Sequence, residues 1–148
     1  MPSRSYEPGS TRSHPRVLVG CAGWSLPRSE HAQFPEAGSH LERYASRFDA
    51  VEINSSFHRP HRPATYARWS ASVPSFFRFS VKVPRTITHG LRLQGAGDLL
   101  ETFLAEVAGL GDKLGCLLVQ LPPSLSFEPA VAAGFFSDLR SRWSLPLA

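Results

Sequence analysis

The chain has little sulfur and no long apolar stretch. Cys21 and Cys116 are its two cysteines among 148 residues, too few for a disulfide framework or a cysteine metal site. Each lies in an apolar, strand-like stretch, so we expect small buried thiols and a reducing cytoplasm. A reactive thiol at Cys21 remains an alternative. No apolar run approaches the roughly 18 residues that span a bilayer, so we expect no membrane partner.

Several sequence signatures are also missing. Residues 1–16 are rich in Ser, Pro and Arg and contain no apolar segment of a secretory signal. We therefore expect a disordered tail over 1–16 and one domain over 17–148. No glycine-rich phosphate loop follows the first apolar run, and no Gly-x-Ser-x-Gly elbow occurs. Paired carboxylates of the glycosidase type are not visible either.

Apolar periodicity in the rest of the chain alternates between strand and helix patterns. We predict strands at 17–21, 50–54, 76–84 and 114–121. Helices are predicted from about 39, over 63–71, over 98–110 with Asp98 as N-cap and Leu99 in the buried stripe, and over 128–142. This β-α alternation predicts an α/β fold with parallel strands, as an open doubly wound sheet or as part of a (β/α) barrel.

Two neighbouring strands carry a polar face, which distinguishes these architectures. Glu52 and Asn54 alternate with apolar residues in one strand, and Arg78, Ser80 and Lys82 do so in the next. Strands of a doubly wound sheet are apolar on both faces, whereas a barrel interior can hold paired charges. We therefore predict a partial (β/α) TIM-like barrel of about four β-α units.

A complete barrel has eight strands and typically about 250 residues, and this chain has about half of that. Its last residues, 146–148, are apolar and stand where a fifth strand would begin. We expect a truncated chain whose unpaired sheet edges promote self-association. An inactive fragment is therefore one functional hypothesis.

Catalytic candidates lie where the carboxyl ends of parallel strands meet. Glu52 could serve as general base or cation ligand, or could pair with Lys82 or Arg78. Lys82 could act as base or Schiff-base nucleophile, hold an anion, or be a structural partner. The substrate-binding candidates are Trp24, Asn54, Ser55, Arg85, His89 and Gln120.

Other roles remain open for several of these residues. Trp24 could stack on a substrate ring or cover the core. Asn54 and Gln120 could orient a polar ligand or satisfy buried hydrogen bonds. Three histidines and Glu52 could approach a divalent cation, but no histidine pair has the i, i+4 zinc spacing, so we predict no metal site. The sequence leaves the cofactor unspecified. The three histidines are His58, His61 and His89.

Charge is unevenly distributed along the chain. The net charge is +4, yet residues 47–92 hold eight Lys or Arg against two acids. Such a basic segment favours an anionic partner. Two functions compete: a hydrolase-like enzyme acting on a small anionic or phosphorylated substrate, and a nucleic-acid-binding protein with arginine phosphate contacts. Solvated surface arginines are the alternative to both.

The chain resembles the YecE-like family, a bacterial and archaeal domain of unknown function. The stretches that carry the resemblance are Gly20 to Ser25, Tyr44 to Phe57, Phe77 to Pro84, Ile87 to His89, Leu110 to Gly115 and Gln120 to Pro123. The resemblance implies a TIM-like barrel. Family members continue into a fifth strand and further units, so it also implies that a site built across the barrel is incomplete here. His58 stands where the family often has Tyr.

Overall fold

The computed structural model of the chain describes residues 17–148. The expected tail, 1–16, lies outside the described residues. The strands are β1 (Gly20–Ala22), β2 (Ala50–Ile53), β3 (Arg78–Lys82) and β4 (Leu114–Leu118). The helices are α1 (His40–Ala45), α2 (Pro63–Ala71), α3 (Gly97–Val107) and α4 (Pro129–Arg142). Short helical turns occur at η1 (Arg28–Gln33), η2 (Ser55–Phe57), η3 (Thr86–Gly90) and η4 (Ala108–Lys113).

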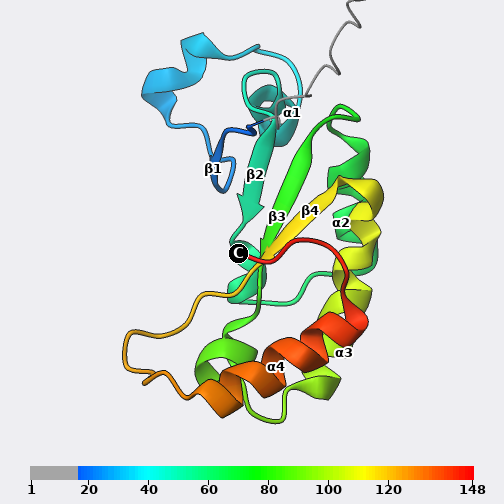
Figure 1. Cartoon of the computed structure of the whole chain (residues 1–148). Coiled ribbons are helices and arrows are strands. Elements are labelled where there is room, and N and C mark those ends of the chain that lie inside the picture. Colours follow the sequence, from blue (N-terminus) through cyan, green and yellow to red (C-terminus); the bar gives the residue numbers. More distant parts are fainter. Residues whose placement is uncertain (1–16) are drawn as a thin grey trace, which may run out of the picture.

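The four strands form one parallel sheet in the sequential order β1-β2-β3-β4. Figure 1 shows α2, α3 and α4 lying on the same side of this sheet. A doubly wound sheet reverses its strand order at a switch point and carries helices on both faces. The sequential order is that of a (β/α) barrel, so the prediction of a partial TIM-like barrel is confirmed. The observed strands are shorter than predicted: β1 begins at Gly20 rather than residue 17, and β3 spans Arg78–Lys82 rather than 76–84.

The last residues of the chain extend the sheet. Leu147 pairs in parallel with Leu117 of β4. The amide of Ala148 donates to the carbonyl of Leu117 at 2.9 Å, and the amide of Val119 donates to the carbonyl of Ala148 at 2.7 Å. The residues expected at the start of a fifth strand therefore lie beside β4.

The strands alternate between a buried face and a polar face. Val51, Ile53, Phe79 and Val81 are at most 2% exposed and face the helices. The intervening side chains of β2 and β3 are only half-buried. The period-two alternation thus separates an apolar core under the helices from a polar sheet face, as predicted.

Local signals fix the helix starts, with one exception. The Ser39 hydroxyl accepts the amide of Glu42, and the Glu42 side chain accepts the amide of Ser39, which completes a capping box before α1. Pro63 opens α2, where its missing N–H is not needed. The prediction of Asp98 as N-cap is wrong: Ala96 holds that position and Asp98 lies in the first turn of α3.

Three burial predictions are also wrong. Cys21 is exposed and Cys116 is half-buried, because β1 is an edge strand and Cys116 belongs to the polar face of β4. Leu99 is 41% exposed rather than part of the buried stripe of α3. Within residues 17–148, no helix is long and apolar enough to cross a membrane.

Candidate functional site

The sheet register sets the height of each polar side chain. Ala22, Glu52, Ser80 and Cys116 are register partners across the four strands. Glu52 therefore lies opposite Ser80, which precedes Lys82 by two residues in β3. This offset explains why the carboxylate of Glu52 and the ammonium of Lys82 are not partners: neither forms an ion pair within residues 17–148.

Lys82 instead lies over an aromatic ring. It is the last residue of β3, and its ammonium nitrogen is 4.4 Å from the centre of the Phe57 ring. Such a cation–π contact contributes about 0.5–1 kcal/mol at exposed sites and more when water is excluded. The ring fixes the ammonium while leaving its hydrogen-bonding capacity open.

Phe57 also brings His89 to this place. The His89 ring lies 5.0 Å from the Phe57 ring in an edge-to-face arrangement. His89 is carried by the π-helical turn η3, and its Nδ1 is 2.9 Å from the Thr88 hydroxyl. Single π-helical turns are frequent at functional sites. Two sequence-predicted residues, Lys82 and His89, therefore meet on the same aromatic ring.

Asn54 and Ser55 follow β2 at the same edge of the sheet. The Oδ1 atom of Asn54 is buried and has no hydrogen-bond partner within the described residues. An unsatisfied buried carbonyl of this kind costs about 1–3 kcal/mol, so it favours a donor supplied from elsewhere. The Ser55 hydroxyl lies 2.8 Å from Nε2 of His61. Burial lowers the pKa of His61, and the charge of Arg59 lowers it further.

The turn η2 is fixed to β3 by the side chain that precedes Phe57. The Ser56 hydroxyl is buried, 2.9 Å from the carbonyl of Ile53 and 2.7 Å from the carbonyl of Lys82. One hydroxyl thus contacts the ends of β2 and β3 together. This contact holds Phe57 at the height of Lys82.

Trp24 and Gln120 lie apart from this cluster. The half-buried Trp24 packs edge-on against Trp69 of α2, with ring centres 5.1 Å apart. The His61 ring contacts the same Trp69 at 5.1 Å, so Trp24 belongs to an aromatic cluster beside α2. Gln120 is exposed, two residues beyond the end of β4.

The possible cation set of three histidines and Glu52 is not brought together. Within residues 17–148, no group of three or more His, Cys, Asp or Glu is close enough to hold a metal ion. His61 and His89 are instead engaged with neighbouring hydroxyls.

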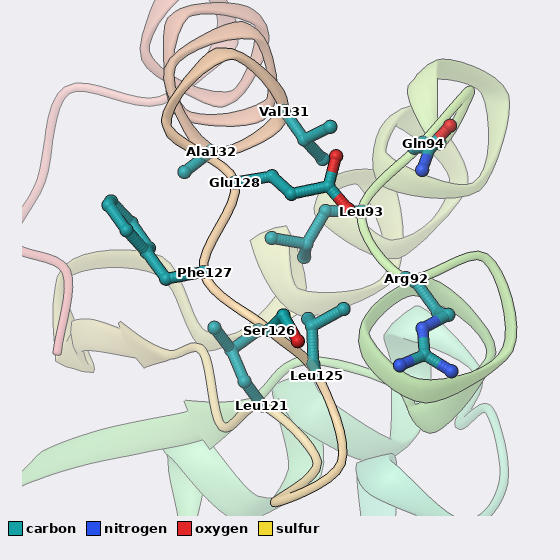
Figure 2. Close-up of a pocket in the computed structure, with 10 residues that line it drawn as sticks. All are labelled: Arg92, Leu93, Gln94, Leu121, Leu125, Ser126, Phe127, Glu128, Val131 and Ala132. Atoms are coloured by element: carbon teal, nitrogen blue, oxygen red, sulfur yellow. The ribbon is translucent and has the colours of Figure 1, made fainter.

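Two cavities flank the strand ends. One, of about 280 Å³, lies between the loops after β2 and β3 and helix α3, and Arg85 is the one sequence-predicted site residue that lines it. The other, of about 260 Å³, lies between the segment 92–94 and the loop before α4, with Leu93, Leu125 and Val131 among its lining residues (Figure 2). Arg92 and Leu93 both have positive φ there, 51° and 71°. Such non-glycine strain persists only where surrounding contacts hold it.

The sequence did not single out Phe57 as the centre of the site, nor Glu106 as a cavity residue. Phe57 carries a usable signal, because an aromatic residue directly follows the polar end of β2. Glu106 carries none, because one carboxylate among the polar positions of a helix resembles any solvated residue.

Comparison with known proteins places the chain in a family. Residues 18–148 match the model of the protein family of unknown function DUF72. The UPF0759 protein YecE of Escherichia coli K12 is 32% identical over 114 residues, which cover 76% of this chain and 42% of that protein. The UPF0759 protein YunF of Bacillus subtilis is 24% identical over 113 residues, 72% of this chain and 40% of that one.

Solved structures share the fold. A crystal structure of the DUF72 family protein EF0366 from Enterococcus faecalis superposes with a TM-score of 0.71 at 23% identity, covering 89% of this chain and 49% of that one. The DUF72 family protein TM1631 from Thermotoga maritima gives a TM-score of 0.66 at 24% identity, covering 88% and 53%. The chain thus spans less than half the length of its curated relatives. With its family model matched over almost all of the described residues, the chain belongs to the DUF72 family.

Proposed function

We propose that the polar sheet face, at the carboxyl ends of β2 and β3, binds a small anionic or phosphorylated substrate in a hydrolase-like reaction. The observation that carries this proposal is the Lys82 ammonium, which rests on the Phe57 ring without a carboxylate partner within residues 17–148. A lysine that is positioned but not neutralised is suited to hold an anionic oxygen.

The neighbouring side chains supply complementary roles. Lys82 stabilises negative charge on the substrate oxygen, which is worth most where that charge grows in the transition state. The unsatisfied Oδ1 of Asn54 accepts a substrate O–H or N–H. Glu52 lies on the same face, opposite Ser80. It accepts a proton from the attacking water as general base. His89 contacts the same Phe57 ring and Ser55 follows Asn54 at the end of β2, whereas Trp24, Arg85 and Gln120 lie farther out.

The proposal is tested by binding and by turnover in the purified chain. Binding of inorganic phosphate is measured by calorimetry, and hydrolysis with p-nitrophenyl phosphate. We expect Lys82→Gln to weaken phosphate binding by about tenfold or more, because a charge-assisted hydrogen bond is lost. Glu52→Gln is expected to keep phosphate binding and lose hydrolysis. Arg28→Gln, which removes one exposed positive charge from η1, is the matched control.

Equal phosphate affinity in the Lys82 and Arg28 variants contradicts the proposal. Lys82-dependent phosphate binding without turnover in the unaltered chain supports the binding site alone. That outcome identifies the chain as an inactive fragment whose catalytic groups are incomplete. The curated relatives are more than twice as long as their matched segments, so groups from the remaining length are available in them.

Nucleic-acid binding is the second candidate function. Arg59, Arg62 and Arg85 are exposed on the loops after β2 and β3, and their side chains make no hydrogen bond or ion pair within residues 17–148. Free guanidinium groups at one end of a sheet are suited to phosphate contacts. The test is the salt dependence of binding to a single-stranded oligonucleotide. Each neutralised arginine should reduce the slope by about 0.7, and Glu52→Gln should leave the affinity unchanged.

A further inference from the structure

A second candidate site is the cavity of about 280 Å³ beside the strand ends. It lies between residues 56–60 after β2, residues 84–87 after β3, and residues 99–106 of α3. All three walls belong to the second and third β/α units.

The floor of this cavity is apolar. Phe57, Ile87 and Phe103 are among the lining residues, and the last two are at most 2% exposed. Leu99 also lines it and is 41% exposed. The cavity explains why this leucine of α3 is not covered: its side chain borders an open chamber instead of the core. An apolar ligand group placed there would remove Leu99 from water, which favours binding.

Charged side chains of both signs border the apolar floor. Arg59 and Arg85 line the cavity, and neither guanidinium has a hydrogen bond or ion pair within residues 17–148. Glu106 lines it from α3, and its carboxylate likewise has no hydrogen bond or ion pair among these residues. Burial raises the pKa of Glu106. Arg59 and Arg85 are exposed and Glu106 is half-buried, so two positive charges and one negative charge border the apolar floor.

We propose that this cavity binds an α-amino acid with an apolar side chain. The ligand carboxylate pairs with Arg59 and Arg85, the ligand ammonium pairs with Glu106, and the apolar side chain packs on Phe57, Ile87 and Phe103. A purely apolar ligand would leave all three charges unmatched, and a simple anion would face the carboxylate of Glu106. The volume lies just below the range of about 300–1,000 Å³ typical of pockets for drug-sized ligands, so it suits a molecule of amino-acid size.

This site is independent of the proposed phosphate site. Phe57 borders both, but Lys82, Glu52 and Asn54 do not line the cavity. Lys82→Gln is therefore expected to bind the amino acid as well as the unaltered chain does. If Lys82→Gln loses phosphate binding and keeps amino-acid binding, the two sites are independent. Each proposal can therefore fail without the other.

The test is a titration followed by amide proton–nitrogen NMR, with L-phenylalanine as the probe. We expect shifts confined to residues 56–60, 84–87 and 99–106. Two analogues test the contribution of each ligand charge separately: 3-phenylpropionate lacks the ammonium, and phenethylamine lacks the carboxylate. Each should bind about tenfold or more weakly than phenylalanine, since one charge-assisted contact is lost.

Variants assign each charge to a residue. The double variant Arg59→Gln with Arg85→Gln should lose affinity for phenylalanine by about tenfold or more and keep its affinity for phenethylamine. Glu106→Gln should lose affinity for phenylalanine and keep that for 3-phenylpropionate. Arg62→Gln, on the same loop as Arg59 but outside the lining, is the control. The dispersion of each variant's spectrum reports whether it is folded.

Three results overturn the proposal. They are the absence of shifts in the three segments, equal binding of phenylalanine and both analogues, and unchanged phenylalanine affinity in the folded double variant.

Discussion

The Lys82 ammonium nitrogen lies 4.4 Å from the centre of the Phe57 ring. This contact holds the charge where β2 and β3 end, so the ring should contribute to anion binding without touching the anion. We predict that Phe57→Leu weakens phosphate binding by about two- to fivefold, which matches the loss of about 0.5–1 kcal/mol of cation–π attraction. Calorimetry measures the affinity. Phe127→Leu, at a side chain that is 78% exposed, should change nothing.

A second prediction concerns the junction of β1 and β2. The Tyr44 hydroxyl accepts the amide of Cys21 at 2.7 Å and donates to the carbonyl of Ala50 at 3.0 Å. Tyr44→Phe keeps the ring stacked on Phe48 and removes both hydrogen bonds. The free energy of unfolding should fall by about 1–3 kcal/mol, since two partly buried backbone groups lose their partner. Urea unfolding measures it, and an unchanged midpoint would contradict the role of this hydroxyl.

The same tyrosine predicts a dependence of stability on high pH. Burial is the main cause that raises the pKa of Tyr44 to about 12. Because the neutral phenol is favoured in the folded state, its contribution is fully present below the unfolded pKa of about 10. It is lost as the pH rises toward 12. The stability difference between the unaltered chain and Tyr44→Phe should therefore shrink between these values. The other buried tyrosine, Tyr66, is present in both proteins and cancels. A constant difference would show that Tyr44 ionises normally.

The sequence predicted the parts of this fold that depend on local periodicity. Alternation along residues 50–54 and 77–82 identified the polar face of the sheet, because side chains of a strand alternate whatever surrounds it. The burial of Cys21 was predicted wrongly, because coverage of an edge strand depends on elements elsewhere. The burial of Leu99 was predicted wrongly for a related reason. Helical periodicity indicates the width of an apolar stripe, but it does not indicate where a cavity borders that stripe.

The candidate site was predictable in location but not in partners. Parallel strands bring Asn54 and Lys82 to one edge of the sheet, and both lie there. The expected pairing of Glu52 with Lys82 is absent within residues 17–148, because the register places Glu52 opposite Ser80. The contact with Phe57 depends on the turn η2 and on the bonds of Ser56 to two carbonyls. Side-chain contacts between loops do not produce a periodic pattern in the sequence, so they could not be predicted from it.

Two glycines offer an opposed pair of substitutions. A Cβ on Gly109 would lie 2.3 Å from the carbonyl oxygen of Pro63 and 3.1 Å from Cβ of Tyr66. Because the obstacle is backbone, Gly109→Ala should destabilise the fold by about 1–3 kcal/mol. Gly134 lies within α4 with nothing within 4 Å of its added Cβ. Gly134→Ala should stabilise by about 0.5–1 kcal/mol through helix propensity. Thermal melts with opposite shifts confirm the close approach of η4 to α2, and equal shifts contradict it.

The exposure of Cys21 makes a chemical prediction. Cys21 is exposed on the edge strand and Cys116 is half-buried on the polar face. A thiol reagent such as Ellman's reagent should modify one cysteine of the folded protein rapidly and the second more slowly. Cys21→Ser should abolish the fast phase, and Cys116→Ser should abolish the slow one. Two thiols that react only after denaturation would instead mean that both are buried.

The outer edge of β1 is the basis of the last prediction. Within residues 17–148, no strand pairs with this edge, and Val17 and Val19, which precede β1 in the chain, are 80% and 60% exposed. An apolar, unpaired strand edge invites pairing with another chain. We expect the average mass from light scattering to rise with protein concentration. Replacing both valines by Lys should suppress that rise, because charge on an edge blocks edge-to-edge pairing. Phe127→Lys removes an equally exposed apolar side chain away from this edge and should leave the rise unchanged. A monodisperse monomer with a cooperative melt at all concentrations would contradict the prediction.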